Sequence, residues 1–154
     1  MSPDKNEMVD KINYQIGQID KLLEKYSDLI KESQQNPPNH VEITALASVL
    51  HSFYHGLENI FSIMAKEMDG NLPKEENWHK KLLSQMAQAK SNRTAIISKK
   101  TQEKLGEYLT FRHFYRHSYS YFLDWARMNH LVYSLNETWE RAKIEIKQFI
   151  KAST

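Results

Sequence analysis

The chain has 154 residues, 40% of them hydrophobic and 26% charged, which is typical of a single folded domain spanning residues 1–154. It has no cysteine, so disulfides and thiolate metal sites are excluded. No apolar run approaches the roughly 20 residues of a membrane span, and the polar start MSPDKNE is unlike a signal peptide. The sequence therefore predicts a cytoplasmic protein without a membrane partner, and its net charge of +2 does not by itself indicate a nucleic-acid binder.

Helical periodicity dominates the first half of the chain. Apolar residues three and four positions apart predict a first helix that runs from Met8 and stops before Pro37. Its apolar stripe continues through Ile12, Ile16, Ile19, Leu22, Tyr26 and Leu29. A second helix, apolar on more than one face, is predicted from about Val41 to Met68, with Gly70 as its terminator.

The second half of the chain predicts three more helices. Asn77 is expected to cap a short third helix, and residues 91–98, SNRTAIIS, form a connection. A fourth helix begins at Ser98 or Thr101, and Asp124 is expected to cap the last one. The last helix carries a heptad seam of Met128, Val132, Leu135, Trp139, Ala142, Ile146 and Phe149.

These elements predict an all-α fold, an up-and-down bundle of four main helices plus a short one. No segment alternates apolar and polar residues as a strand does. Surplus apolar surface on a small bundle favours self-association, so we expect a homodimer.

The segment with the most chemistry is Phe111–Tyr119, FRHFYRHSY, which holds two arginines, two histidines and two tyrosines. Arginine presents a planar fork of donors that fits phosphate oxygens, and histidine can exchange protons near neutral pH. Residues 97–120 carry five lysines and arginines against two glutamates, a local charge of +3. This composition is sufficient to cleave a phosphodiester without a metal or another cofactor.

Geometry limits how these side chains can cooperate. If Thr101–Tyr119 is one continuous helix, Arg112, Arg116 and Tyr119 share a face, and His113 and His117 share the neighbouring one. Arg112 and His117 then lie about 140° apart around the axis. A break near Tyr115, or a second subunit, would bring them together.

Such a site suits cleavage of RNA by its own 2′-hydroxyl. One histidine removes the hydroxyl proton, a second acid protonates the leaving 5′-oxygen, and arginines stabilise the charge on the phosphate oxygens. The products are a 2′,3′-cyclic phosphate and a 5′-hydroxyl, and DNA lacks the nucleophile. Phe114, Tyr115, Tyr119 and Tyr121 offer stacking surfaces for unpaired bases.

Other interpretations of the same residues stay open. Most arginine–histidine pairs at a helix surface only interact with solvent. The core, rather than a base-stacking surface, is the expected place of the aromatic residues Phe111, Phe114, Tyr115 and especially Phe122. The pairs His113 with His117 and His51 with His55 have a metal-binding spacing, but neither has an evident third ligand. Glu58, among apolar neighbours, is either a buried partner of an arginine or a solvent-facing residue.

The segment Arg112–Tyr119 resembles the R-x4-H-x-Y signature of HepT-like ribonuclease toxins in the HEPN superfamily. The resemblance covers roughly residues 40–150, through YHGLENIFSIMAKEMDG, LPKEENWHKKLLSQMA and RHFYRHSYSYFLDWARM. It implies an all-helical bundle that dimerises, in which arginine and histidine from both chains form a metal-independent site. Arg112 and His117 are then the catalytic pair, and His113 and Arg116 support them.

The resemblance also implies a partner. Proteins of this family are paired with a minimal nucleotidyltransferase antitoxin that transfers AMP to the motif tyrosine, which matches Tyr119 here. A second possibility is a non-catalytic HEPN partner that binds substrate for a nucleotidyltransferase, and a third is a plain dimerisation module. Neither the RNA that is cleaved, tRNA or mRNA, nor assembly beyond a dimer follows from the sequence.

Overall fold

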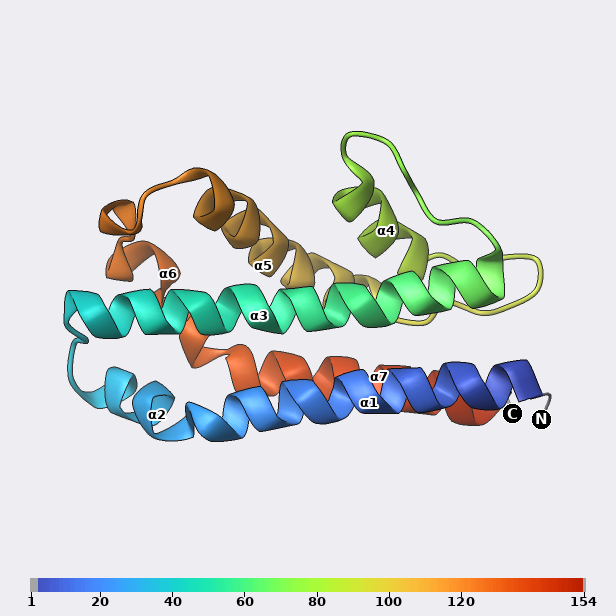
Figure 1. The fold of residues 1–154 in the computed structure, drawn as a ribbon, viewed down its shortest axis with the longest axis horizontal. Coiled ribbons are helices and arrows are strands. Elements are labelled where there is room, and N and C mark those ends of the chain that lie inside the picture. The colour runs from blue at the N-terminus through green and yellow to red at the C-terminus, as the bar shows by residue number, and fades with distance from the viewer. Residues whose placement is uncertain (1–2, 154) are drawn as a thin grey trace.

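The computed structural model describes residues 3–153, and all the secondary-structure elements named within them are helices (Figure 1). In chain order these are α1 (Pro3–Lys25), α2 (Ser27–Gln35), α3 (His40–Met64), the π-helix η1 (Ala65–Asp69), α4 (Trp78–Met86), α5 (Lys99–His117), the 3-10 helix η2 (Ser120–Phe122), α6 (Trp125–Tyr133) and α7 (Leu135–Ser153). The predicted all-α bundle is confirmed. None of the helices in this range is both long and apolar enough to span a membrane.

Helix α3 is the centre of the bundle. Figure 1 shows α1 and α7 along one side of it and α4 and α5 on the other, and α3 contacts α1, α4, α5 and α6. Its apolar residues cover most of its circumference, so all of these neighbours can bury them. The only charged side chain buried along α3 within the described residues is Glu58.

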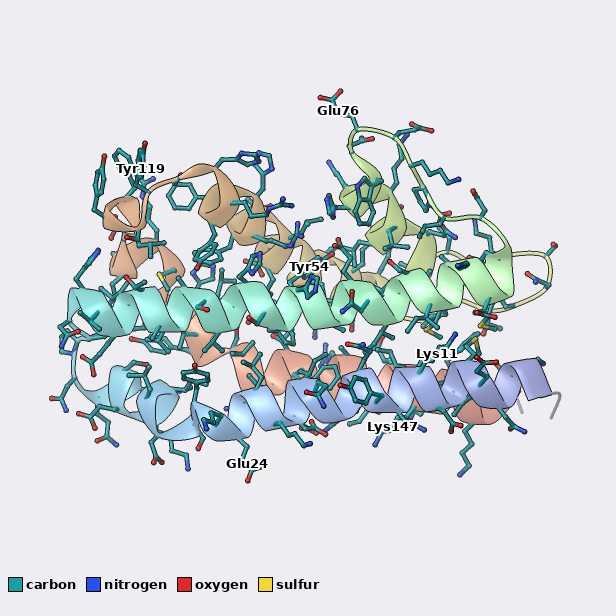
Figure 2. The ribbon with its side chains drawn as sticks, in the orientation of Figure 1. Lys11, Glu24, Tyr54, Glu76, Tyr119 and Lys147 are labelled. Carbon is teal, nitrogen blue, oxygen red and sulfur yellow. The ribbon has the colours of Figure 1, made fainter. Side chains whose placement is uncertain are left out.

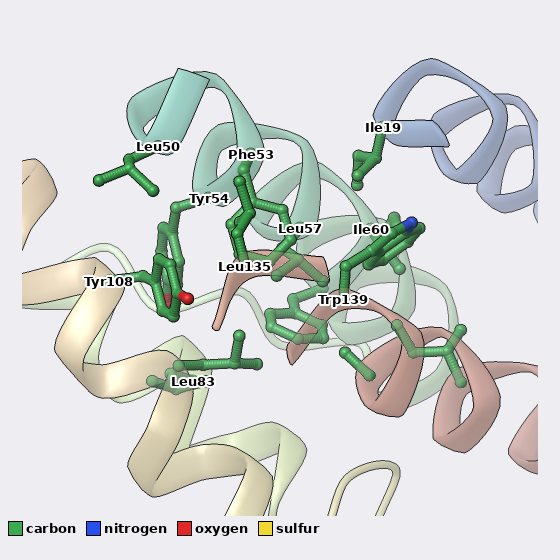
Figure 3. Packing of buried hydrophobic residues seen from close by; sticks show 14 of the residues in the cluster. Ile19, Leu50, Phe53, Tyr54, Leu57, Ile60, Leu83, Tyr108, Leu135 and Trp139 are labelled. Atoms are coloured by element: carbon green, nitrogen blue, oxygen red, sulfur yellow. The ribbon is translucent and has the colours of Figure 1, made fainter. Parts of the chain in front are cut away.

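Three aromatic rings from different helices form the middle of the core (Figure 3). The ring of Phe53 packs edge-on against Tyr108 at 5.3 Å and against Trp139 at 6.2 Å between ring centroids. Such pairs contribute about 0.5–1.5 kcal/mol beyond their burial. On the side of α3 that faces α1, a Cβ at Gly56 would lie 2.7 Å from Cγ1 of Ile19, so a larger residue there would require the Ile19 side chain to shift.

The predicted helix ends are largely confirmed. Gly70 adopts a left-handed φ of 64° after η1, which ends the helical run. The Oγ of Ser98 accepts the Thr101 N–H, and Asp124 caps α6. Asn77 occupies the cap position of α4, but its side chain makes no capping hydrogen bond.

Two predicted helices are each split into two. The first breaks at Tyr26, which is exposed, while Leu23 and Ile30 are buried instead. The last breaks at Ser134, whose hydroxyl donates to the His130 carbonyl at 2.8 Å and so competes with the helical backbone. The predicted heptad seam is nevertheless buried along its whole length.

Candidate active site in the cleft between α4 and α5

Arg112 is buried, with 8% of its surface exposed. It continues the stripe of Thr101, Leu105 and Tyr108, which are spaced by four and three residues and face the bundle interior. The guanidinium therefore lies inside the bundle, whereas the neighbouring Arg116 is exposed.

His117 is exposed and is the last residue of α5. The helix runs without interruption past Tyr115, so the break considered there does not occur. Arg112 and His117 consequently remain about 140° apart on the helix. A single chain does not bring this pair together.

Tyr119 lies outside the helix, which contradicts the expectation that it shares a face with Arg112 and Arg116. Ser118 is extended, with φ −129° and ψ 154°, and turns the chain away before η2. Tyr119 is 70% exposed, and its ring stacks on that of Tyr121 with centroids 5.5 Å apart. Figure 2 shows Tyr119 beyond the end of α5, away from α4.

The partner of Arg112 is Glu58 on α3, a buried residue with 5% of its surface exposed. Nη2 of Arg112 lies 3.8 Å from Oε1 of Glu58, beyond hydrogen-bond distance. Nε of Arg112 is buried and has no hydrogen-bond partner among the described residues. Glu58 is thus the buried arginine partner that one of the two sequence interpretations anticipated, and the pairing is loose.

The other carboxylate oxygen of Glu58 binds a histidine from α4. Nδ1 of His79 lies 2.6 Å from Oε2 of Glu58, and the His79 ring stacks on Trp78 with centroids 3.7 Å apart. One carboxylate on α3 therefore connects an arginine on α5 with an imidazole on α4. His79 was not predicted from the sequence as a site residue, because its partner is 21 positions away and no local pattern marks it.

A cleft of about 1160 Å³ is lined by residues of α4 and α5. Its walls include His79 from α4 and Arg112 and His113 from α5. The ring of His113 also contacts that of His117, with centroids 4.6 Å apart. His113 is thus the residue that connects the cleft with the exposed end of α5.

A second histidine cluster lies on the α3 side of α5. The His51 ring stacks on Tyr115 at 5.1 Å, and His55 lies 6.5 Å from His51. Burial lowers the pKa of His51, and the positive charge of Arg112 lowers it further. His51 therefore favours its neutral form near the candidate site.

The aromatic side chains around the motif divide into two groups. Phe111 and Tyr115 pack against the core, as predicted, and Tyr115 is thereby occupied with His51. Phe114 and Phe122 are exposed, so their predicted place in the core is wrong. Because η2 follows the turn at Ser118, Phe122 lies on the surface beside the stacked tyrosines.

The chain was also compared with known proteins. A scan against protein families matches residues 45–153 to a family described as HepT-like protein. Searches of curated proteins and of solved structures found no significant match. Among the residues that the structure describes, no group of three or more histidine, aspartate and glutamate side chains is placed to hold a metal ion.

Proposed function

The chain belongs to the HepT-like family of the HEPN superfamily, and on this basis we propose that it is a metal-independent endoribonuclease toxin. Its substrate is RNA, tRNA or mRNA, and its products are a 2′,3′-cyclic phosphate and a 5′-hydroxyl. The catalytic residues are Arg112 and His117, supported by His113 and Arg116. A nucleotidyltransferase antitoxin neutralises it by transferring AMP to Tyr119.

The observation that carries this proposal is the state of Arg112. A buried guanidinium normally satisfies its donors, yet Arg112 has one ion pair at 3.8 Å and a buried Nε without a partner. It lines an open cleft together with His113. A phosphate oxygen in that cleft is the kind of ligand that a guanidinium with unused donors binds.

His117 serves as the acid for the leaving 5′-oxygen in this proposal. It is exposed beside His113 and faces away from Arg112 of its own chain. A two-fold dimer in which the α5 ends meet would place His117 of one chain near the cleft of the other. The proposed enzyme is therefore a homodimer with composite sites.

The first experiment incubates purified protein with total RNA in EDTA and analyses the ends of the fragments. We expect wild-type protein to leave cyclic phosphates and DNA to be resistant. Arg112→Ala and His117→Ala should each lower the cleavage rate by about 100-fold or more while circular dichroism shows folded protein. Arg141→Ala, which removes an exposed arginine on α7, is the matched control.

Two results would contradict this assignment. Cleavage by either variant at the wild-type rate would exclude that residue from the site. No cleavage by wild-type protein whose intact mass shows no attached AMP would favour the non-catalytic HEPN partner of a nucleotidyltransferase.

Tyr119 is proposed as the AMP acceptor because its side chain is accessible. The tyrosine hydroxyl attacks the α-phosphate of ATP, and pyrophosphate leaves. Since Tyr119 is two residues from His117, the added nucleotide would obstruct the approach of RNA and bring negative charge to the α5 end.

Incubation with the antitoxin and ATP, followed by peptide mass spectrometry, tests this acceptor. Tyr119→Phe should remain an active nuclease and escape neutralisation. Tyr121→Phe is the matched control, because its tyrosine is also exposed and stacks on Tyr119. AMP on Tyr121 with full neutralisation of Tyr119→Phe would refute the assignment.

A further inference from the structure

The α4–α5 cleft contains a proton-transfer group that the motif does not include. His79 lies on its wall, and a buried carboxylate holds one of its ring nitrogens at 2.6 Å. The same carboxylate is paired with Arg112. The inference drawn from this arrangement rests on the proposed ribonuclease function.

The contact with Glu58 determines which nitrogen of His79 is available. A carboxylate paired with arginine accepts hydrogen bonds, so the proton of the contact belongs to Nδ1 of His79. In the neutral ring Nε2 then carries a lone pair. A carboxylate behind the opposite nitrogen also stabilises the imidazolium that forms when Nε2 takes a proton, as in hydrolase triads.

The orientation of the ring is fixed from two sides. Glu58 holds Nδ1, and the indole of Trp78 stacks on the ring face. About three quarters of the His79 side chain is buried, since 24% of it is exposed. A histidine that only solvates a helix surface has neither constraint.

We propose that His79 is the general base of the RNA cleavage reaction. Nε2 of His79 takes the proton of the 2′-hydroxyl, and the 2′-oxygen forms a bond to phosphorus while Arg112 binds the phosphate oxygens. The bond from phosphorus to the 5′-oxygen breaks, and that oxygen takes a proton from His117 of the second chain of the proposed dimer. His79 then gives its extra proton to water, and His117 takes a proton from water, so both residues return to their starting states.

The experiment compares His79→Ala and His79→Asn with wild type on RNA in EDTA. Asparagine keeps an N–H near the Nδ1 position, so it can still donate to Glu58, but it has no equivalent of Nε2. We expect both variants to cleave about 100- to 10,000-fold more slowly, the usual contribution of a general base. Added imidazole should restore part of the His79→Ala rate, because the cleft is large enough to admit it.

Further readouts separate chemistry from folding and base from acid. His130→Ala is the matched control, since His130 also faces a carboxylate, Glu107, at 3.7 Å but lies outside the cleft. It should cleave normally. An RNA with sulfur as the 5′ leaving atom does not need an acid, so the His79 defect should persist on it while the His117→Ala defect largely disappears.

Each outcome is decisive. Cleavage by His79→Asn at the wild-type rate would show that His79 only holds Glu58 and would overturn the proposal. The proposal would also be overturned if the His79 variants cleaved the RNA with a 5′ sulfur leaving atom at the wild-type rate. If wild type and His79→Ala cleave equally, the general base is another residue but the nuclease assignment stands. If wild type itself fails to cleave, both fail.

Discussion

Among the residues that the structure describes, two buried pairs join an arginine to a carboxylate, and they are built differently. Arg93 and Asp69 form a bidentate pair, with both nitrogen–oxygen distances at 2.7 Å. Arg93 also donates to the carbonyls of Gln85, Gln88 and Thr94, so all three of its nitrogens have partners. The side chains of Arg112 and Glu58 are also at least nine-tenths buried, but their single contact is 3.8 Å long.

We interpret this difference as a difference in role. Arg93 connects the end of the α3–η1 run with the loop after α4, and the hydrogen bond from Arg93, despite opposing burial, lowers the pKa of Asp69. A pair whose donors are all used has none left for a ligand. Arg112 has N–H donors without partners at the wall of a cleft. This arrangement lowers stability, and binding of an anion there would offset the loss.

The largest expected effect is on stability, when the Arg93–Asp69 pair, whose donors all have partners, is broken. Arg93→Met removes both close hydrogen bonds from the guanidinium to the buried Asp69 carboxylate, which keeps the one from the Gln85 amide, and we expect a loss of about 3–5 kcal/mol in the free energy of unfolding. Arg112→Met should cost only about 1 kcal/mol, because it breaks no close hydrogen bond and Glu58 keeps His79. Urea unfolding followed by circular dichroism measures both, and equal losses would show that Arg112 is as structural as Arg93.

Activity should show the reverse order. Arg112→Lys keeps the charge but loses the planar fork, so we expect cleavage to fall by about 100-fold, near 2.7 kcal/mol of barrier. Arg93→Lys should cleave at close to the wild-type rate wherever it is folded. Single-turnover rates on one RNA measure both, and an equal fall in the two variants would mean that lysine at 112 impairs folding rather than chemistry.

A smaller effect on stability is expected from a third polar contact, which joins α1 and α7. Asp20 accepts hydrogen bonds from Trp139 Nε1 at 2.7 Å and from Lys143 at 2.9 Å. Burial opposes ionisation of Asp20, but these two donors outweigh it and lower the pKa of the carboxyl. Since the folded pKa is below 3.8, the contribution is present above that pH and is lost as pH falls through the folded value.

Asp20→Asn should therefore weaken the dependence of stability on acid. Because Asp20 is partly exposed, we expect a difference of at most about 1 kcal/mol at neutral pH, shrinking below pH 4. Tryptophan fluorescence during urea unfolding at a series of pH values measures it. A gap between wild type and variant that stays constant with pH would show that ionisation of Asp20 is not responsible.

Burial was more predictable from the sequence than helix continuity. The seam from Met128 to Phe149 is buried because spacing alone decides which side chains face the core. The break at Ser134 within it depends on hydroxyl contacts with His130 and with Tyr108 of α5, which no local pattern records. The extended backbone at Ser118 likewise has no glycine or proline to announce it.

The candidate site was predictable only in part, for the same reason. Arg112 follows Leu105 and Tyr108 at helical spacing, so its burial was available from the sequence. Glu58 was anticipated as one of two alternatives from its apolar neighbours. The approach of His79 to Glu58 depends on how α4 packs against α3, a tertiary contact that periodicity does not encode.

The smallest expected effect is on the pKa of His51, which distinguishes the charge of Arg112 from that of Arg93. Burial lowers the pKa of His51, and the charge of Arg112 lowers it further, because the Glu58 carboxylate, 3.8 Å from the guanidinium, only partly offsets that charge. With a folded pKa below 6.5, His51 favours the folded state above that pH, and this contribution is lost as pH falls through the interval between the two values. His51→Gln should remove a few tenths of a kcal/mol of pH dependence from this partly exposed group.

NMR titration of the His51 ring protons provides the direct measurement. Arg112→Met should raise the pKa of His51 towards 6.5, since one of the two main causes of its shift is removed. Arg93→Met should leave the His51 titration unchanged at temperatures where it is folded, because the bidentate contact with Asp69 neutralises that charge locally. An equal shift in both variants would indicate a general loosening of the bundle, and the distinction between a saturated and an unsaturated arginine would no longer hold.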